Sequence, residues 1–254
     1  MSWTESRARN TLNPMYGDTD MRGMVKTAAA VSLSLAVVML VGCGSMKTSM
    51  LPSDYTKMES EFAASQGNKA FSFWHGKEGG HRAIGIDGDA LVIHDLDSGV
   101  TQRIGKPGDG KNEFSRPSAI VVEDDLLLVL ERGNRRIQVF HLPDMQSFGF
   151  FGAEQLNDPS TLALYRIENA SFYVYVVDTV RSNGQETDII LRYSVSRGVD
   201  TIHGLYLLSF GYTNSNGWLE NVRSLKVDQD NRQVLVDAGG SVRAFTLEGD
   251  SARQ

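Results

Sequence analysis

The stretch "EFSRPSAIVVEDDLLLVLERGNRRIQVFHLPD" (residues 113–144) decides the fold. It contains three apolar runs, with an acidic turn after the first and a Gly-Asn-Arg-Arg turn after the second. Short runs of β-branched and other large apolar residues, bounded by polar turn residues, are typical of strands joined as hairpins. The stretch therefore predicts three consecutive β-strands and two tight turns.

The same order of runs and turns recurs along the chain. Residues 116–152 open on Arg-Pro-Ser and close on Phe-Gly, and residues 158–211 open on Asp-Pro-Ser and close in the same way. A further copy covers residues 221–254, and a degraded one covers residues 83–105. Four-strand units that repeat every 40–55 residues or so are typical of propeller blades. The sequence thus predicts an all-β domain over residues 68–254, a β-propeller of about four four-stranded blades.

The last copy stops soon after "AFTLEGD" (residues 244–250), before a fourth strand. Propellers contain 4–8 blades, at about 40–45 residues each. The propeller domains that this repeat resembles generally need six, and the resemblance therefore implies an incomplete six-bladed ring with open strand edges: an open arc, a fragment, or a chain completed by a partner. Open edges invite pairing with other chains, so self-association through them is also expected.

The segment before the domain has the features of a bacterial lipoprotein leader. Residues 21–42 begin with basic residues, continue into an apolar run, and lead directly to the chain's one cysteine, Cys43. The apolar run is short for a ~30 Å hydrocarbon core, so a signal peptide is favoured over a spanning helix. The sequence "LVGC" (residues 40–43) resembles a lipobox, which implies that Cys43 is lipidated. Residues 1–20 are interpreted as a non-native extension or a misassigned start, and residues 43–67 as the lipidated cysteine with a flexible tether.

This leader predicts a location in the bacterial cell envelope, with the protein held to a membrane by its N-terminal lipid. Gly44 follows the cysteine, and by resemblance to sorted lipoproteins this favours the outer membrane, with the domain on a periplasmic or outer face. The formal net charge of −6 argues against a nucleic-acid partner, because such proteins usually carry a basic face.

The stretch from residue 105 to residue 152 resembles an NHL-type propeller repeat, through the run "NRRIQVF" and the closing Phe-Gly. Together with "LALYRIENASFYVYVVD" and "SLKVDQDNRQVLV", it is similar to bacterial secreted propellers of the β-propeller phytase (BPP) domain. The resemblance implies a 3-phytase, which would hydrolyse phosphomonoesters of myo-inositol hexakisphosphate with Ca²⁺ as cofactor. The calcium ions would polarise the phosphate and activate water.

Acidic residues close the second strand of three copies, and basic residues follow the first of them. If the copies are equivalent, the acids recur at equal depth around one axis. A ring of carboxylates with arginines beside it suits Ca²⁺ and phosphate together. The expected metal ligands are Glu131, Asp178, Glu220 and Asp237. The expected phosphate-binding residues are Arg132, Arg135 and Arg136. The competing interpretation is that acid and arginine form a structural pair within each blade.

The segment "GKPGDGKN" (residues 105–112) nearly matches a phosphate-binding P-loop. Its last residue is Asn112 where the motif needs a Ser or Thr hydroxyl, and a P-loop must lead into a helix. Because the segment leads into a blade instead, we interpret it as a loop between blades.

Two functions from different classes therefore remain. One is a lipid-anchored phytase-like hydrolase, weakened or inactive because blades are missing. The alternative is a non-enzymatic NHL-like propeller that binds a protein or glycan partner in the envelope. Fold does not decide between them, because propellers serve many functions.

Overall fold

The computed structural model describes residues 52–67, 69–77, 79–168, 170–182, 184–211 and 217–252. The expected leader, Cys43 and the start of the expected tether lie outside these residues. Within them, no helix is both long and apolar enough to cross a membrane.

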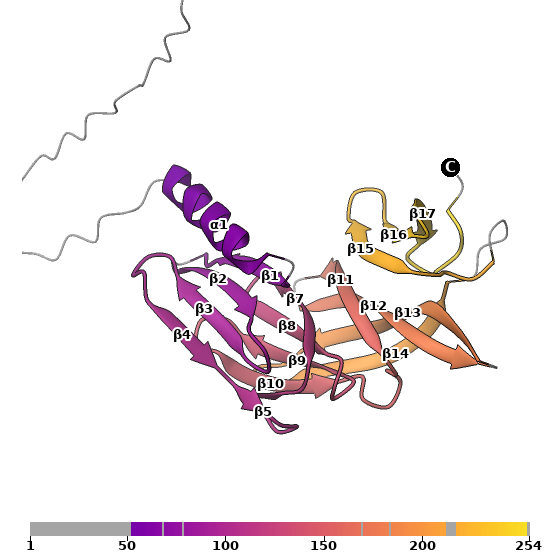
Figure 1. Ribbon diagram of the computed structural model, residues 1–254, viewed down its shortest axis with the longest axis horizontal. Helices are drawn as coiled ribbons and strands as arrows, with labels where there is room; N and C mark the ends of the chain where they lie inside the picture. Colours follow the sequence, from indigo (N-terminus) through magenta and orange to yellow (C-terminus); the bar gives the residue numbers. More distant parts are fainter. Residues whose placement is uncertain are drawn as a thin grey trace, which may run out of the picture. The chain divides into compact units, whose positions relative to one another are not determined.

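Fifteen of the seventeen strands found in the described residues form four consecutive antiparallel sheets (Figure 1). The first sheet contains β1 (Phe71–His75), β2 (His81–Ile86), β3 (Leu91–Asp95) and β4 (Thr101–Ile104). The second contains β7 (Pro117–Glu123), β8 (Leu126–Glu131), β9 (Arg136–His141) and β10 (Gln146–Phe151). The third contains β11 (Pro159–Glu168), β12 (Ser171–Ser182), β13 (Gln185–Arg197) and β14 (Ile202–Phe210). The fourth contains β15 (Val222–Asp228), β16 (Gln233–Ala238) and β17 (Ser241–Thr246). The short strands β5 (Lys106–Pro107) and β6 (Glu113–Phe114) pair in parallel between the first two sheets.

Within each sheet the strands follow chain order, and the first strands of successive sheets contact one another. Strand β7 lies between β1 and β11, and β11 also contacts β15. Antiparallel sheets whose strands follow chain order, and whose first strands pack next to one another, are the blades of a β-propeller. The predicted fold class is therefore confirmed.

Strand β8, the second strand of its sheet, is buried on both faces, which explains its continuous apolar run. Strand β8 is buried throughout, and its residues alternate between two hydrophobic clusters. Leu127 and Val129 pack toward the first sheet, whereas Leu128 and Leu130 pack toward the third. This alternation is the two-residue period of a strand. A third cluster, which includes Tyr175 from β12, joins the third and fourth sheets.

The three clusters join consecutive sheets, and no strand of the fourth sheet pairs with the first in the described part of the chain. The fourth sheet has three strands, as the last copy of the repeat predicted. After β17 the chain turns back, and the Ala252 amide donates to the Ala244 carbonyl (2.9 Å) beside a bridge between Phe245 and Ser251. A fourth antiparallel strand is thus started at the outer edge of β17.

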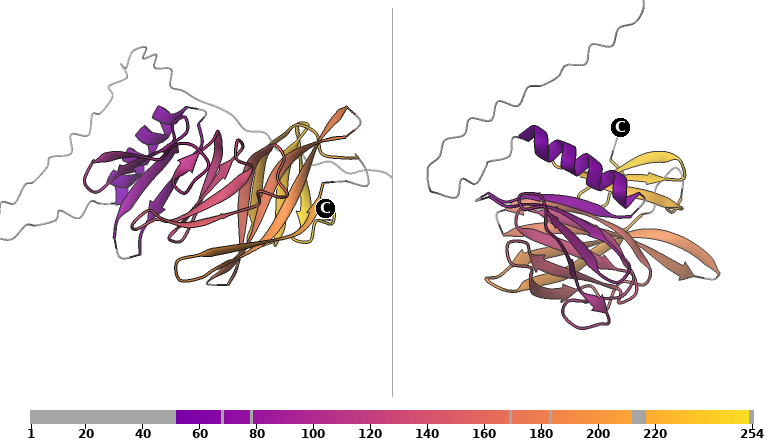
Figure 2. Two further views of the ribbon diagram at one scale, coloured as in Figure 1. Left: turned by 90° about the horizontal axis from the view of Figure 1, so that it is seen from below. Right: turned by 60° about the vertical axis from the view of Figure 1, so that its left-hand side comes forward.

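Two boundaries differ from the prediction. The first blade begins at Phe71 rather than at residue 83, because the aromatic strand β1 precedes the copy that the repeat revealed. The expected tether also contains helix α1 (Pro52–Gln66), which lies along β1 and β2 (Figure 2). Phe62 holds the helix there through edge-to-face contacts with Phe71 and Phe73, at 6.4 and 6.2 Å between ring centroids. The polar composition that suggested a flexible tether belongs to the remaining helix surface.

Candidate functional site

Glu131, at the end of β8, is fully buried and accepts hydrogen bonds from four groups. Arg136 Nε donates to Oε1 at 2.6 Å, and Asn134 Nδ2 donates to Oε2 at 2.6 Å. The Ser115 amide (3.0 Å) and Gln138 Nε2 (3.2 Å) complete the set. A carboxylate surrounded by N–H donors in this way is a structural centre, because its oxygens have little capacity left for a cation or for water.

Arg136 carries this network into the loop before the second blade. Its guanidinium is buried and donates to the carbonyls of Asp109, Gly110 and Glu113, with the last two at 3.0 Å. The Phe150 ring lies 4.4 Å from the guanidinium carbon. The expected pairing of an arginine with the acid across the hairpin is confirmed for Arg136.

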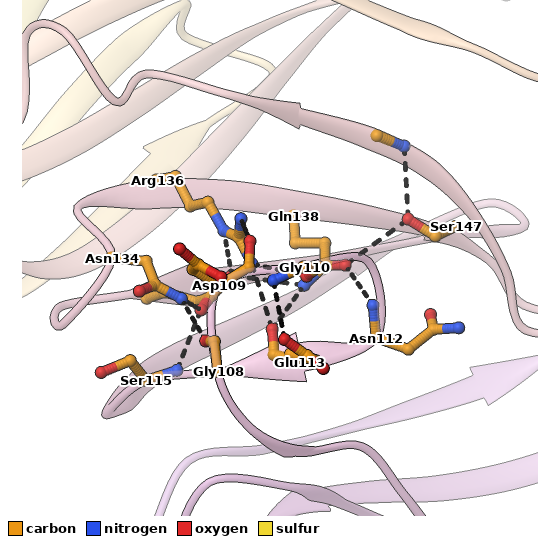
Figure 3. A network of polar contacts seen from close by, with 12 residues as sticks. Gly108, Asp109, Gly110, Asn112, Glu113, Ser115, Asn134, Arg136, Gln138 and Ser147 are labelled. Atoms are coloured by element: carbon orange, nitrogen blue, oxygen red, sulfur yellow. Dashed lines mark hydrogen bonds and ion pairs between the residues drawn. The ribbon is translucent and has the colours of Figure 1, made fainter.

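The same contacts explain the P-loop-like segment. Carbonyls of Gly108, Asp109 and Gly110 point to Asn134 and Arg136, as the dashed lines of Figure 3 show. A P-loop instead directs backbone N–H groups at phosphate. Here the amide of Asn112 donates to Gln138 Oε1 at 2.9 Å, so it is already used. The carbonyls of this segment thus accept hydrogen bonds from the guanidinium of Arg136. The segment is a loop between blades, as we interpreted it from the sequence.

In the turn after Glu131 it is Arg135 that has a positive φ, at 52°. Gly133 is needed in the same turn because a Cβ there would clash with Ser115. The side chain of Arg135 is exposed to solvent.

Asp178, on β12, repeats the structural role of Glu131 in the third sheet. Its buried carboxylate accepts from the Asp158 amide at 2.7 Å and from the Asn157 amide at 3.0 Å. Asn157 Nδ2 also donates to it, at 3.2 Å. Burial raises the pKa of Asp178, while these N–H donors act to lower it. In both sheets a buried acid therefore holds the segment that enters the first strand.

Asp237 is not equivalent to these two acids. Glu131 and Asp178 each pair with the first residue of their sheet, just before a one-residue bulge. In the fourth sheet that first residue is Val222, and it pairs with Ala238. Asp237 comes one position earlier, and successive residues of a strand point to opposite faces. The expected ring of equal carboxylates is thus interrupted at the fourth sheet.

The four expected ligands do not fit a common calcium ion. Glu131 and Asp178 belong to separate sheets, and each is taken up by its own N–H donors. In the described residues, no three His, Cys, Asp or Glu side chains are grouped so that they could hold a metal ion. Of the expected phosphate-binding residues, Arg132 donates two bonds to Asp158 and holds the pKa of that carboxyl below its ordinary value.

Glu220 leads to a different site. It lines a cleft of about 310 Å³ where the third and fourth sheets meet, which we call the acidic cleft. The cleft contains three carboxylates, from Glu186, Asp188 and Glu220, and two hydroxyls, from Ser160 and Thr179. Asn221 and Val222 complete the lining.

Asp188 gives the acidic cleft a fixed wall. Its Oδ1 accepts from the Thr179 hydroxyl at 2.7 Å, and its Oδ2 accepts from the Val222 amide at 2.8 Å. Through the second bond it holds the entry to the fourth sheet, where the strand register provides no acid equivalent to Glu131. Glu186 forms an exposed ion pair with Arg181.

Of the residues that line the acidic cleft, the repeat pattern pointed to Glu220 but not to Glu186, Asp188, Ser160 and Thr179. Two features of the sequence mark most of these other residues. The acids of "GQETDII" (residues 184–190) stand directly before an apolar run, and Ser160 follows the proline that opens the repeat. Ser160 is the bulge residue of β11, as Ser118 is of β7. Their meeting depends on how the third sheet is packed against the entry to β15, which no local pattern reveals.

Several solved structures are similar to this chain in fold, at low sequence identity. No family model matches the chain, and no curated protein matches its sequence. The β-propeller domain of Myceliophteria thermophila Cps50 (Swd1) is 14% identical, with a TM-score of 0.37, and the match covers 70% of this chain and 64% of that one. A complex of KlAtg21 with the coiled-coil of AgAtg16 matches at 9% identity and a TM-score of 0.39, covering 67% and 65%. Kluyveromyces lactis Hsv2p matches at 8% identity and a TM-score of 0.30, covering 71% and 61%.

This chain spans less than two thirds of each of these solved chains. The class of protein that the four sheets define is the β-propeller, and its function has to be argued from the acidic cleft.

Proposed function

We propose that this chain is a non-enzymatic propeller module of the bacterial envelope, which binds a basic segment of a protein partner in the acidic cleft. The observation that carries the proposal is the lining of the cleft, in which carboxylates of Glu186, Asp188 and Glu220 stand beside hydroxyls. A lysine or arginine side chain matches this lining in charge and in hydrogen bonding.

The size and rigidity of the cleft support the proposal. About 310 Å³ lies at the lower end of the ~300–1,000 Å³ typical of ligand sites. Asp188 is held by two hydrogen bonds, so part of the wall is already in place before a partner binds. The ion pair of Glu186 with Arg181 is exposed, and such pairs are worth little, so a basic side chain of the partner can replace Arg181.

The phytase-like alternative is less well supported. Glu131 and Arg136 bind each other within a buried network, and the carboxylates of the acidic cleft repel a polyanion such as inositol hexakisphosphate. Phosphate release from this compound in millimolar Ca²⁺ separates the two functions. Robust turnover would favour the hydrolase. A neutral glycan partner would be distinguished from a basic protein segment by binding that does not depend on salt concentration.

Replacing Glu220 with glutamine is expected to weaken the binding of a short lysine-rich peptide by up to about fivefold, because an exposed ion pair contributes ~0.2–1 kcal/mol. Glu220 is exposed, so the substitution should leave the fold intact. Fluorescence anisotropy of a labelled peptide at low ionic strength would measure the change, and added salt should reduce binding further.

The matched control is Glu154→Gln, which removes the same charge from another exposed position. Equal losses in the two variants would mean that the peptide responds to the net charge of the protein. A loss confined to Glu220→Gln supports the acidic cleft.

We also propose that the module is anchored to the envelope through a lipid on Cys43. In the full chain, Cys43→Ala is expected to move the protein from the membrane fraction to the soluble fraction of lysed cells, because lipid chains supply membrane affinity of ~0.8 kcal/mol per buried CH₂. Mass spectrometry of the N-terminal peptide would detect the lipid. Unchanged partitioning of the variant would place the anchor elsewhere.

A further inference from the structure

The outer strands of the four sheets differ in how they are protected. An open strand edge exposes unpaired backbone groups, and natural proteins protect such edges with short strands, charges or bulges. Strand β4 has four residues and carries Arg103. Strand β10 is interrupted by a bulge at Phe148. Strand β17 carries Arg243 and is partly covered by residues 250–252.

Strand β14 has the least protection among these four. It is nine residues long, and its sequence, IHGLYLLSF, contains no Asp, Glu, Lys or Arg. Its one irregularity is a bulge at Leu207. Three consecutive apolar residues in its centre are exposed: Leu205 by 67%, Tyr206 by 38% and Leu207 by 37%.

The sheet itself holds β14 firmly in place. One side of the strand pairs with β13 along its length, and Tyr206 meets Tyr193 edge to face at 5.9 Å between ring centroids. Gly204 packs directly on Phe151 of the second sheet. The opposite side of β14 is the outer edge of the third sheet. It is therefore a rigid edge rather than a frayed end.

We propose that β14 is a dimerisation edge, which pairs antiparallel with β14 of a second copy of this chain. Two identical strands related by a twofold axis place each residue opposite its counterpart at the mirrored position. A charged residue near the axis would then face its own kind, and β14 has none. Near such an axis the exposed apolar side chains of one copy cover those of the other.

Disulfide trapping in the full chain tests this pairing, with Cys43→Ala as the background that removes the native thiol. Cysteine is introduced singly at positions 205, 206 and 207, and Gln102→Cys on β4 serves as the control. Cα atoms of opposed residues in an antiparallel pair lie ~4.5–5.5 Å apart, within the range of a disulfide. We expect a covalent dimer that peaks at one of the three positions and falls at its neighbours, because the axis passes through one place.

A charge on the edge supplies the second arm. Added to the best-trapped variant, a lysine in place of an exposed β14 leucine (Leu205→Lys or Leu207→Lys) should reduce the dimer to the Gln102→Cys level. Val242→Lys, on exposed β17, should leave trapping unchanged. Trapping equal to Gln102→Cys at all three positions would overturn the proposal, as would trapping that the β14 lysine does not reduce. Neither result depends on peptide binding in the acidic cleft.

Discussion

Replacing Glu131 with alanine is expected to lower the free energy of unfolding by about 3–5 kcal/mol, the usual cost of removing one partner of a buried ion pair. The substitution leaves the buried guanidinium of Arg136 without its counter-charge. It also leaves the amide of Ser115 and the side chains of Asn134 and Gln138 without an acceptor. Urea unfolding followed by circular dichroism measures the loss. Because domains are stable by only ~5–15 kcal/mol, this is a large share of the total.

A double-variant cycle keeps this prediction testable even where the single variant is barely folded. Glu131→Leu combined with Arg136→Met removes both charges, and the combined loss should be smaller than the sum of the single losses by at least about 1 kcal/mol. Glu154→Ala, at an exposed position, should change stability by no more than about 0.5 kcal/mol. A Glu131→Ala variant of undiminished stability would contradict the structural role and reopen a catalytic one.

Replacing Asp178 with alanine is expected to cost at least about 2 kcal/mol, since each buried donor left without an acceptor costs ~1–3 kcal/mol. The donors concerned are the amides of Asn157 and Asp158 and the side chain of Asn157. Asp237→Ala is the matched control, because that half-buried carboxylate points to the other face of its strand. The two substitutions should differ clearly in urea unfolding. Equal losses would mean that the one-residue shift in register has no energetic consequence.

The loss of stability in Asp178→Ala should depend on pH, because the pKa of Asp178 is raised in the folded protein. Between the ordinary carboxyl pKa and the raised one, the folded protein holds more protons than the unfolded chain. The stabilising effect of Asp178 therefore decreases as pH rises through that interval. The gap in unfolding free energy between wild type and Asp178→Ala should narrow from acidic toward neutral pH. A gap that widens instead would show that the N–H donors outweigh burial.

The fold could be predicted from sequence because its signals are local. Strand β8 is apolar at every position but its last, because the side chains on each of its two faces pack in a hydrophobic cluster. The recurring order of apolar runs and turns indicated four blades, two of which share a Pro-Ser opening and a Phe-Gly ending. Helix α1 was missed because few of its side chains are apolar, so its packing through Phe62 leaves little trace in composition.

The site was harder to predict because it depends on register and on distant strands. In the fourth sheet Ala238, and not Asp237, pairs with the first residue of β15, and this pairing register cannot be seen in a pattern of residues. The acidic cleft joins residues from Ser160 to Val222, so its carboxylates meet only after the sheets are packed. The structural pair of an acid and an arginine within a blade was one of the two interpretations from sequence, and Glu131 and Arg136 form such a pair. Both side chains are buried, so each is the other's charge partner.

The most direct test of the acidic cleft as the binding site is zero-length cross-linking of a lysine-rich peptide to the full chain with a carbodiimide, followed by mass spectrometry. Carbodiimide joins a carboxylate to an amine in direct contact, so it reports which acids the bound peptide touches. We expect cross-links at Glu186, Asp188 and Glu220, and their loss at high salt. Cross-links spread over exposed acids such as Glu154 and Asp200, with none in the cleft, would contradict it.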